Sequence, residues 1–148
     1  MAAIVGYEVN IGWDISFPTI VDLSVKQYYF AVLGSDGNLV VASTAGGPVL
    51  GVIQDGPVGT SSSTRGCAVR LGGVSKVVCG GTFNPGDLLT TDSAGKAVKY
   101  TGASVYTGTP YTVSGSQVVG VALSAGAAGD LATINFNPQG LAAAGATA

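Results

Sequence analysis

Short runs of β-branched and aromatic residues, separated by clusters of Gly, Pro, Asn, Asp and Ser, recur along most of this sequence. The clearest runs are 26–33, 38–43, 48–54, 67–71, 74–79, 96–100, 117–123 and 131–136. This spacing is typical of the strands and turns of a β-sandwich or β-barrel. The 24 glycines disfavour long helices, and no segment holds an i, i+3, i+4 apolar stripe over three turns. The sequence therefore predicts an all-β domain.

The segment "GTFNPGDLLTTDSAGKAVKY" (81–100) contains Gly-Asp and Gly-Lys pairs, which raises the question of a phosphate-binding loop. Such a loop needs a glycine five residues before the Gly-Lys glycine and Ser or Thr after the lysine, but Thr90 and Ala97 stand there. Turn chemistry explains the same residues. We interpret "NPGD" (84–87) as one turn and "DSAG" (92–95) as the turn of a hairpin.

An internal repeat links the two halves of the chain. The segments "SDGNLVVAS", "PVLGVIQDG" and "GCAVRL" resemble "DSAGKAVKY", "QVVGVALSAG" and "GDLATI", and each copy carries a Gly-Val pair, at Gly51 and at Gly120. The second copy contains an insertion at 101–116. The pattern predicts a compact barrel or sandwich built of two similar β-units; the alternative is chance similarity among short Gly/Val-rich strands.

Two segments fall outside this pattern. Residues 1–25 carry aromatic and aliphatic side chains without hairpin signals, and we expect an extended N-terminal arm that takes part in an interface. Residues 137–148 are of low complexity, and we expect a flexible C-terminal tail. Residues 26–136, with the inserted loop 101–116, form the expected β-domain, since 148 residues is the size of one domain.

Charge is scarce in this chain. Charged residues make up 9% of it, against about 25% in typical domains. Because soluble monomers normally keep a charged surface, this composition indicates that much of the surface contacts other protein; the alternative is a secreted, Ser/Thr/Gly-rich β-protein. The net charge of −2 and six scattered basic residues give no basic stripe and disfavour nucleic-acid binding.

The N-terminal sequence predicts synthesis in the cytoplasm with no membrane step. "MAAIVGYEVNIGWDISF" has no Lys or Arg and is interrupted by Glu8, Asn10 and Asp14, unlike a signal peptide. No apolar run approaches the roughly 18 residues needed to cross a bilayer.

The sequence offers no catalytic constellation, metal site or cofactor motif, and we expect a protein that is not an enzyme. It contains no histidine, and a serine nucleophile would need a motif that is not present. Asp36 and Asp92 occupy similar places in the two repeats and are a conceivable dyad, but their contexts are those of hairpin turns. Calcium would need several loop oxygens among Asp36, Asn38, Asp87, Asp92 and Asp130 to converge, and no Asp-x-Asp-x-Asp spacing is present. Cys67 and Cys79 are interpreted as buried apolar side chains, with a disulfide as the alternative.

Aromatic residues in the arm and in the inserted loop are the candidate interface residues, because aromatics are enriched at interface centres and these segments are not needed for the β-core. Ordinary core aromatics are the alternative. The candidates for contact with other protein are Tyr7, Trp13, Phe17, Tyr106 and Tyr111.

Over about residues 25–136 the sequence resembles the small capsid decoration, or cement, proteins of tailed bacteriophages. The resemblance rests on Gln27-Tyr28, on Pro48 with Gly51-Val52, on "GVSKVV" from Gly73 and on "GDLLTTDSAGKAV" from Gly86, together with the late Gly-Val and Gly-Asp pairs. These are structural glycines, turns and strands, and not catalytic signatures.

The resemblance implies a barrel-like or tulip-shaped domain that binds the outer face of a phage capsid as a homo-oligomer, most often a trimer, with a dimer as the alternative. Its partners would be other copies and the major capsid protein, whose neighbouring subunits it would cement. It would then be found on the exterior of the virion after synthesis in the cytoplasm of the host bacterium. A receptor- or carbohydrate-binding module of a virion fibre is the alternative function.

Overall fold

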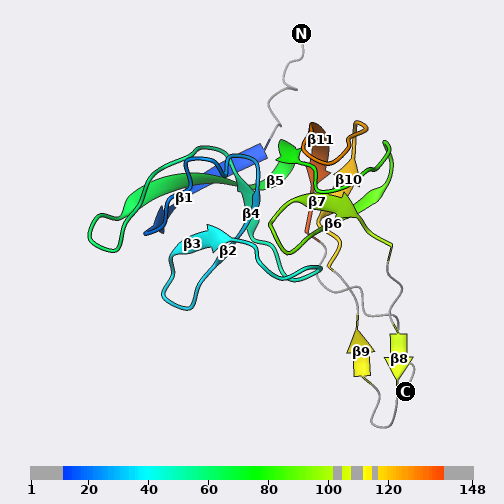
Figure 1. Cartoon of the computed structure of the whole chain (residues 1–148), viewed down its shortest axis with the longest axis horizontal. Coiled ribbons are helices and arrows are strands. Elements are labelled where there is room, and N and C mark those ends of the chain that lie inside the picture. The colour runs from blue at the N-terminus through cyan, green and yellow to red at the C-terminus, as the bar shows by residue number, and fades with distance from the viewer. Residues whose placement is uncertain (1–11, 102–104, 108–111, 115–116, 139–148) are drawn as a thin grey trace.

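The computed structural model describes residues 12–101, 105–107, 112–114 and 117–138, and these residues form strands and loops without a helix (Figure 1). The all-β prediction is therefore confirmed. The strands are β1 (Gly12–Thr19), β2 (Phe30–Leu33), β3 (Leu39–Val41), β4 (Gly51–Ile53), β5 (Arg65–Val78), β6 (Leu88–Thr91), β7 (Ala97–Lys99), β8 (Val105–Thr107), β9 (Thr112–Ser114), β10 (Gly120–Ala122) and β11 (Leu131–Phe136).

Nine strands form one antiparallel sheet that curls into a half-barrel. Its order is β3-β2-β4-β5-β11-β10-β6-β7, and β1 also pairs with β5. Strands β8 and β9, from the inserted loop, form a separate two-stranded sheet. In Figure 1 the long β5 spans both halves of the molecule, so that it joins them as one continuous strand.

The sheet order is symmetric about the β5–β11 pair, which confirms the predicted two β-units. We call residues 12–72 the first unit and residues 73–138 the second unit. In the first unit Ala31 pairs with Val41 and with Gly51. In the second unit Leu89 occupies the same position and pairs with Lys99 and with Gly120. Two residues are called equivalent when they occupy the same register position in the two units, as Ala31 and Leu89 do.

The repeat extends further than the sequence motifs indicated, because β1 and the second half of β5 are also equivalent. Phe17 on β1 pairs with Cys67, and Val77 on β5 pairs with Ala132. Residues 12–19 of the expected arm are therefore a strand of the main sheet and do not lie outside the β-core. The extended conformation expected for the arm is present there, while residues 1–11 lie outside the described residues.

Each unit has an apolar core of its own. The core of the second unit contains Val77, Cys79, Phe83, Leu89, Ala97, Val119, Ala122, Ala132, Ile134 and Phe136, together with four first-unit residues, Phe30, Ala42, Val49 and Val52. The core of the first unit contains Leu23, Ala31, Leu39, Ile53, Cys67 and Val69, with Phe17, Tyr29, Val41, Leu50 and Leu71 packed against it. Burial of these side chains supplies the main stabilisation of a domain of this size.

The predicted turns are present. In "NPGD" Gly86 has φ of 90°, and the Asp87 carboxylate accepts a hydrogen bond from the Asn84 N–H at 2.9 Å. In "DSAG" Gly95 has φ of 82°, and Asp92 accepts hydrogen bonds from the backbone N–H groups at positions 94 and 96. The second turn closes the predicted β6–β7 hairpin.

Candidate interface surface

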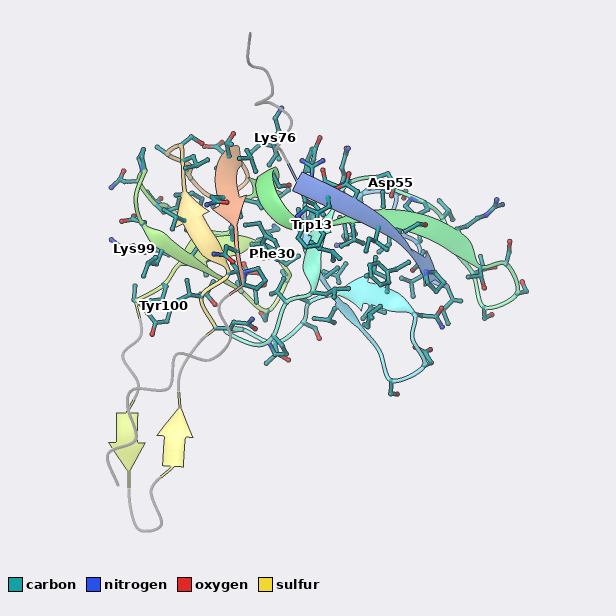
Figure 2. All side chains as sticks on the ribbon, turned by 180° about the vertical axis from the view of Figure 1, so that it is seen from behind. Trp13, Phe30, Asp55, Lys76, Lys99 and Tyr100 are labelled. Atoms are coloured by element: carbon teal, nitrogen blue, oxygen red, sulfur yellow. The ribbon has the colours of Figure 1, made fainter. Side chains whose placement is uncertain are left out.

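Strand β1 presents exposed apolar side chains at the position where it begins to pair with β5. Trp13 is 65% exposed and Ile15 is 45% exposed. The Trp13 indole lies over Gly72, where a Cβ would be 3.5 Å from the ring nitrogen. The indole therefore lies close to the backbone of β5 and remains largely accessible; Figure 2 labels Trp13.

An ion pair fixes the strand next to this tryptophan. The Arg70 guanidinium donates to both carboxylate oxygens of Asp14, at 2.8 and 3.1 Å, and donates a third hydrogen bond to the Val74 carbonyl at 2.8 Å. The register between β1 and β5 shifts between Trp13 and Asp14. Bidentate pairing adds geometric specificity to a charge pair, so the shift in register is held in one arrangement.

Phe17 differs from Trp13 in its environment. Its side chain is partly buried and packs against the core of the first unit. Thr19, two residues further on, is fully buried, and its hydroxyl donates to the Leu39 carbonyl at 2.9 Å. Along β1 the side chains on this face therefore pass from exposed Ile15 to buried Thr19, and Phe17 serves the fold as well as any interface.

The side chains of the other three candidate interface residues lie outside what the structure describes. Tyr7 and Tyr111 lie outside the described residues, and Tyr106 is on β8 without a described side chain. The structure therefore brings together two of the five sequence candidates, Trp13 and Phe17, on one strand, and their role in an interface stays a prediction.

Several exposed aliphatic residues were not selected from the sequence. Leu33 is 41% exposed, Leu88 45%, Leu123 50% and Leu131 52%. A signal for two of them was present. Alternation within "LLTT" and "LATINF" places Leu88 and Leu131 on the face opposite to the buried residues that follow them.

The aspartates considered as a dyad or as metal ligands act as turn residues. Asp36 accepts a hydrogen bond from the Asn38 N–H at 3.0 Å, and hydrogen bonding by the Asn38 side chain and then by its backbone lowers the pKa of the Asp36 carboxyl group. Asp130 likewise accepts from the Ala127 N–H at 3.1 Å. Within the described ranges, no group of three or more His, Cys, Asp or Glu side chains is arranged to hold a metal ion.

Both cysteines are free and buried, as the sequence interpretation held, and they belong to the cores of different units. Burial, together with the nearby Asp55 carboxylate, raises the pKa of Cys67 to about 12. Burial also raises the pKa of Cys79, with a further contribution from Asp130. The reactive thiolate form is therefore strongly disfavoured at neutral pH.

We expect the native thiols to resist alkylation. A shift of the Cys67 pKa from 9.0 to about 12 lowers the thiolate fraction at pH 8 by about 1,000-fold. Iodoacetamide labelling followed by mass spectrometry measures the rate, and the urea-unfolded chain is the control. Native labelling as fast as in the unfolded chain would contradict the buried placement.

Among the described residues no helix has the length and hydropathy needed to span a membrane.

Comparison with known proteins gives a structural neighbour and no sequence relative. No family model matches the chain, and no curated protein matches it. Its fold is similar to the crystal structure of the N base of the head fibre protein gp8.5 of bacteriophage phi29, with a TM-score of 0.59 and 18% sequence identity. The match covers 84% of this chain and 95% of the phi29 chain. At this identity the similarity shows a shared fold.

Proposed function

We propose that this protein is a structural component of a bacteriophage virion, which binds the outer surface of the capsid as a homo-oligomer and cements neighbouring major capsid protein subunits. The observation that carries the proposal is the similarity in fold to the base of a phage head fibre protein over most of both chains. The sequence resemblance to phage decoration proteins supports it independently.

The surface chemistry fits adhesion to protein. Only 9% of the residues are charged, and the described residues expose Trp13 and several large aliphatic side chains. A standard protein–protein contact buries about 1,600 Å², and a few central aromatic anchors carry most of its binding energy. In this proposal Trp13 is such an anchor, and the exposed Ile15 side chain on the same strand adds apolar contact area beside it.

Cementing would follow from multivalency. An oligomer carries one capsid-binding surface per copy, so that after the first contact the others bind at high effective concentration. Copies attached to different capsid subunits then resist separation of those subunits. The expected location is the capsid exterior, after synthesis in the host cytoplasm.

Mixing purified protein with shells that lack it tests the proposal. Electron microscopy with image averaging is expected to show regular additional density on the shell exterior. A second measurement, shell survival on heating or at low salt, is expected to improve when the protein is bound. Shells with no added density would refute the cementing function.

The phi29 neighbour favours one alternative, a role in a virion fibre. In that case the chain would be the base or a receptor- or carbohydrate-binding module of a fibre. The averaged electron-microscopy density distinguishes the two functions. For a cement protein we expect a low feature that touches several capsid subunits. For a fibre protein we expect a feature that projects from one site. A glycan array adds a second criterion, because the cement function expects no specific glycan.

A further inference from the structure

The two units are equivalent in register but unequal in burial. Phe17, Leu50 and Leu71 line the core of the first unit and are only partly buried. Their equivalents in the second unit, Val77, Val119 and Phe136, are 1%, 0% and 1% exposed. Equivalent core positions are therefore shielded from solvent in the second unit and partly exposed to it in the first unit.

The second unit is closed because the first unit covers it. Phe30, Ala42, Val49 and Val52 of the first unit belong to the core cluster of the second unit. The Phe30 and Phe136 rings lie with their centroids 6.1 Å apart. The Phe30 N–H also donates to the Gly95 carbonyl at 2.8 Å, and the Gly46 N–H to the Thr91 carbonyl at 2.8 Å. We call this contact the unit junction.

Two further pairs of equivalent residues show the open side of the first unit. Gly95 is packed under the first unit, where a Cβ would be 2.5 Å from Val41, whereas its equivalent Gly37 has the same positive φ and no atom within 4 Å. Thr91 is 1% exposed, whereas its equivalent Leu33 is 41% exposed. We call the surface around Leu33, Gly37, Leu50 and Leu71 the open mouth of the first unit.

The second unit carries a surface equivalent to the one that closes the junction. Phe30 and Val52 pair with each other in the first unit, and their equivalents Leu88 and Val121 pair in the second. Leu88 is 45% exposed, and Leu123, the equivalent of Gln54, is 50% exposed. Tyr100, the equivalent of Ala42, comes directly after β7 and is partly buried. We call this surface the free end of the second unit.

Figure 2 shows the contrast between the two surfaces. Phe30 lies in the interior of the molecule, between the units, whereas Tyr100 lies at the periphery of the second unit. In repeat proteins the terminal units need polar outer faces to remain soluble. Here the described ends of the repeat expose large aliphatic side chains instead, and at the free end these lie beside the Lys99–Asp87 ion pair, whose Nζ–Oδ1 distance is 3.5 Å.

We propose that copies of this protein associate head-to-tail, with the free end of the second unit of one copy packed into the open mouth of the first unit of the next. The contact would reproduce the unit junction between chains. Leu88 of one copy would take the place of Phe30, and Leu71 of the next copy would take the place of Phe136. Aliphatic pairs would then replace the aromatic pair of the junction.

A head-to-tail contact has a definite consequence for assembly. It uses two different surfaces, so it closes into a ring when the rotation between copies allows and otherwise grows into a filament. The trimer expected from the resemblance would be a ring of three. This inference rests on the homo-oligomer in the proposed function, but its test needs no capsid.

The first test uses one charged substitution on each surface. Leu88→Arg blocks the free end and Leu33→Arg blocks the open mouth, and both side chains are exposed enough for the fold to tolerate the change. Wild-type protein is expected to have a multiple of the 14.5 kDa chain mass by light scattering, and each variant the mass of one chain. Loss of a central apolar anchor corresponds to association about 30-fold weaker or more.

Val25→Arg is the matched control. Val25 is 75% exposed and lies in the turn from Leu23 to Lys26, ahead of β2, and it is not among the residues that form the unit junction. The control is expected to keep the wild-type mass. Circular dichroism and thermal unfolding of all three variants verify that their folds are intact.

The second test distinguishes a head-to-tail contact from a symmetric one. Mixing Leu88→Arg with Leu33→Arg is expected to give a two-chain complex, because the intact mouth of one variant can bind the intact end of the other. A symmetric contact between identical surfaces gives no such complementation. A mixture that stays at one chain mass, or a wild-type protein of one chain mass, would overturn the head-to-tail contact. Capsid density from wild-type protein would in that case still support the proposed function.

Discussion

Gly120→Ala is expected to lower the free energy of unfolding by about 3 kcal/mol or more and the melting temperature by roughly 10 °C. A Cβ at Gly120 would be 2.2 Å from the Asn135 carbonyl oxygen and 3.1 Å from its carbonyl carbon. These are backbone atoms of the paired strand β11, so no side-chain rotation relieves the clash. The two central strands of the second unit would have to separate. Thermal unfolding followed by circular dichroism measures the effect.

The repeat supplies a second position and a control for this prediction. At Gly51, the equivalent of Gly120, a Cβ would be 2.5 Å from the Arg70 carbonyl oxygen, so Gly51→Ala is expected to be similarly destabilising. At Gly129, φ is 90° but nothing lies within 4 Å, so Gly129→Ala is expected to cost only about 1 kcal/mol. A Gly120→Ala variant that melts within 1–2 °C of wild type would contradict the close approach of β10 and β11.

These glycines explain why the sequence predicted so much of the fold. The Gly-Val pairs that indicated the repeat are the places where two backbones approach too closely for any side chain. Turn residues were equally informative, because a positive φ at Gly86 or Gly95 is a local requirement that glycine meets without strain. Features fixed by local backbone geometry could therefore be predicted.

Features that depend on contacts between residues far apart in the sequence could not be predicted. β1 contains a proline and an aspartate and has no hairpin partner close in sequence; it is a strand because β5, about fifty residues later, pairs with it. β5 was predicted as two runs because Gly72 and Gly73 interrupt its apolar pattern. The strand nevertheless continues through them, because β1 pairs with its residues 65–73 and β11 with its residues 73–78.

The candidate site shows the same division. Aromatic composition selected Trp13 and Phe17 alike, and it could not separate the exposed Trp13 from Phe17, which packs against the core of the first unit. The open mouth and the free end are not visible in composition at all. They become visible only when the exposed fractions of equivalent residues in the two units are compared, because apolar residues occupy these positions in both units.

Trp13→Ala is expected to weaken binding to capsid shells by about 30-fold or more while leaving the fold intact. The side chain is 65% exposed, so its loss changes stability by no more than about 0.5 kcal/mol. Truncation of a central aromatic anchor typically costs about 2 kcal/mol or more of binding energy, which is the stated fold-change. Sedimentation of variants with shells measures occupancy, and thermal unfolding measures the fold.

Two matched variants make this result specific. Phe17→Ala removes a partly buried core contact and is expected to destabilise the fold by about 2 kcal/mol, less than truncation of a fully buried phenylalanine. Val25→Ala removes another exposed apolar side chain and is expected to bind shells normally. Since oligomers bind more tightly than single chains, the mass of Trp13→Ala must also equal that of wild type. Normal shell occupancy by Trp13→Ala at limiting concentration would exclude the start of β1 as the capsid anchor.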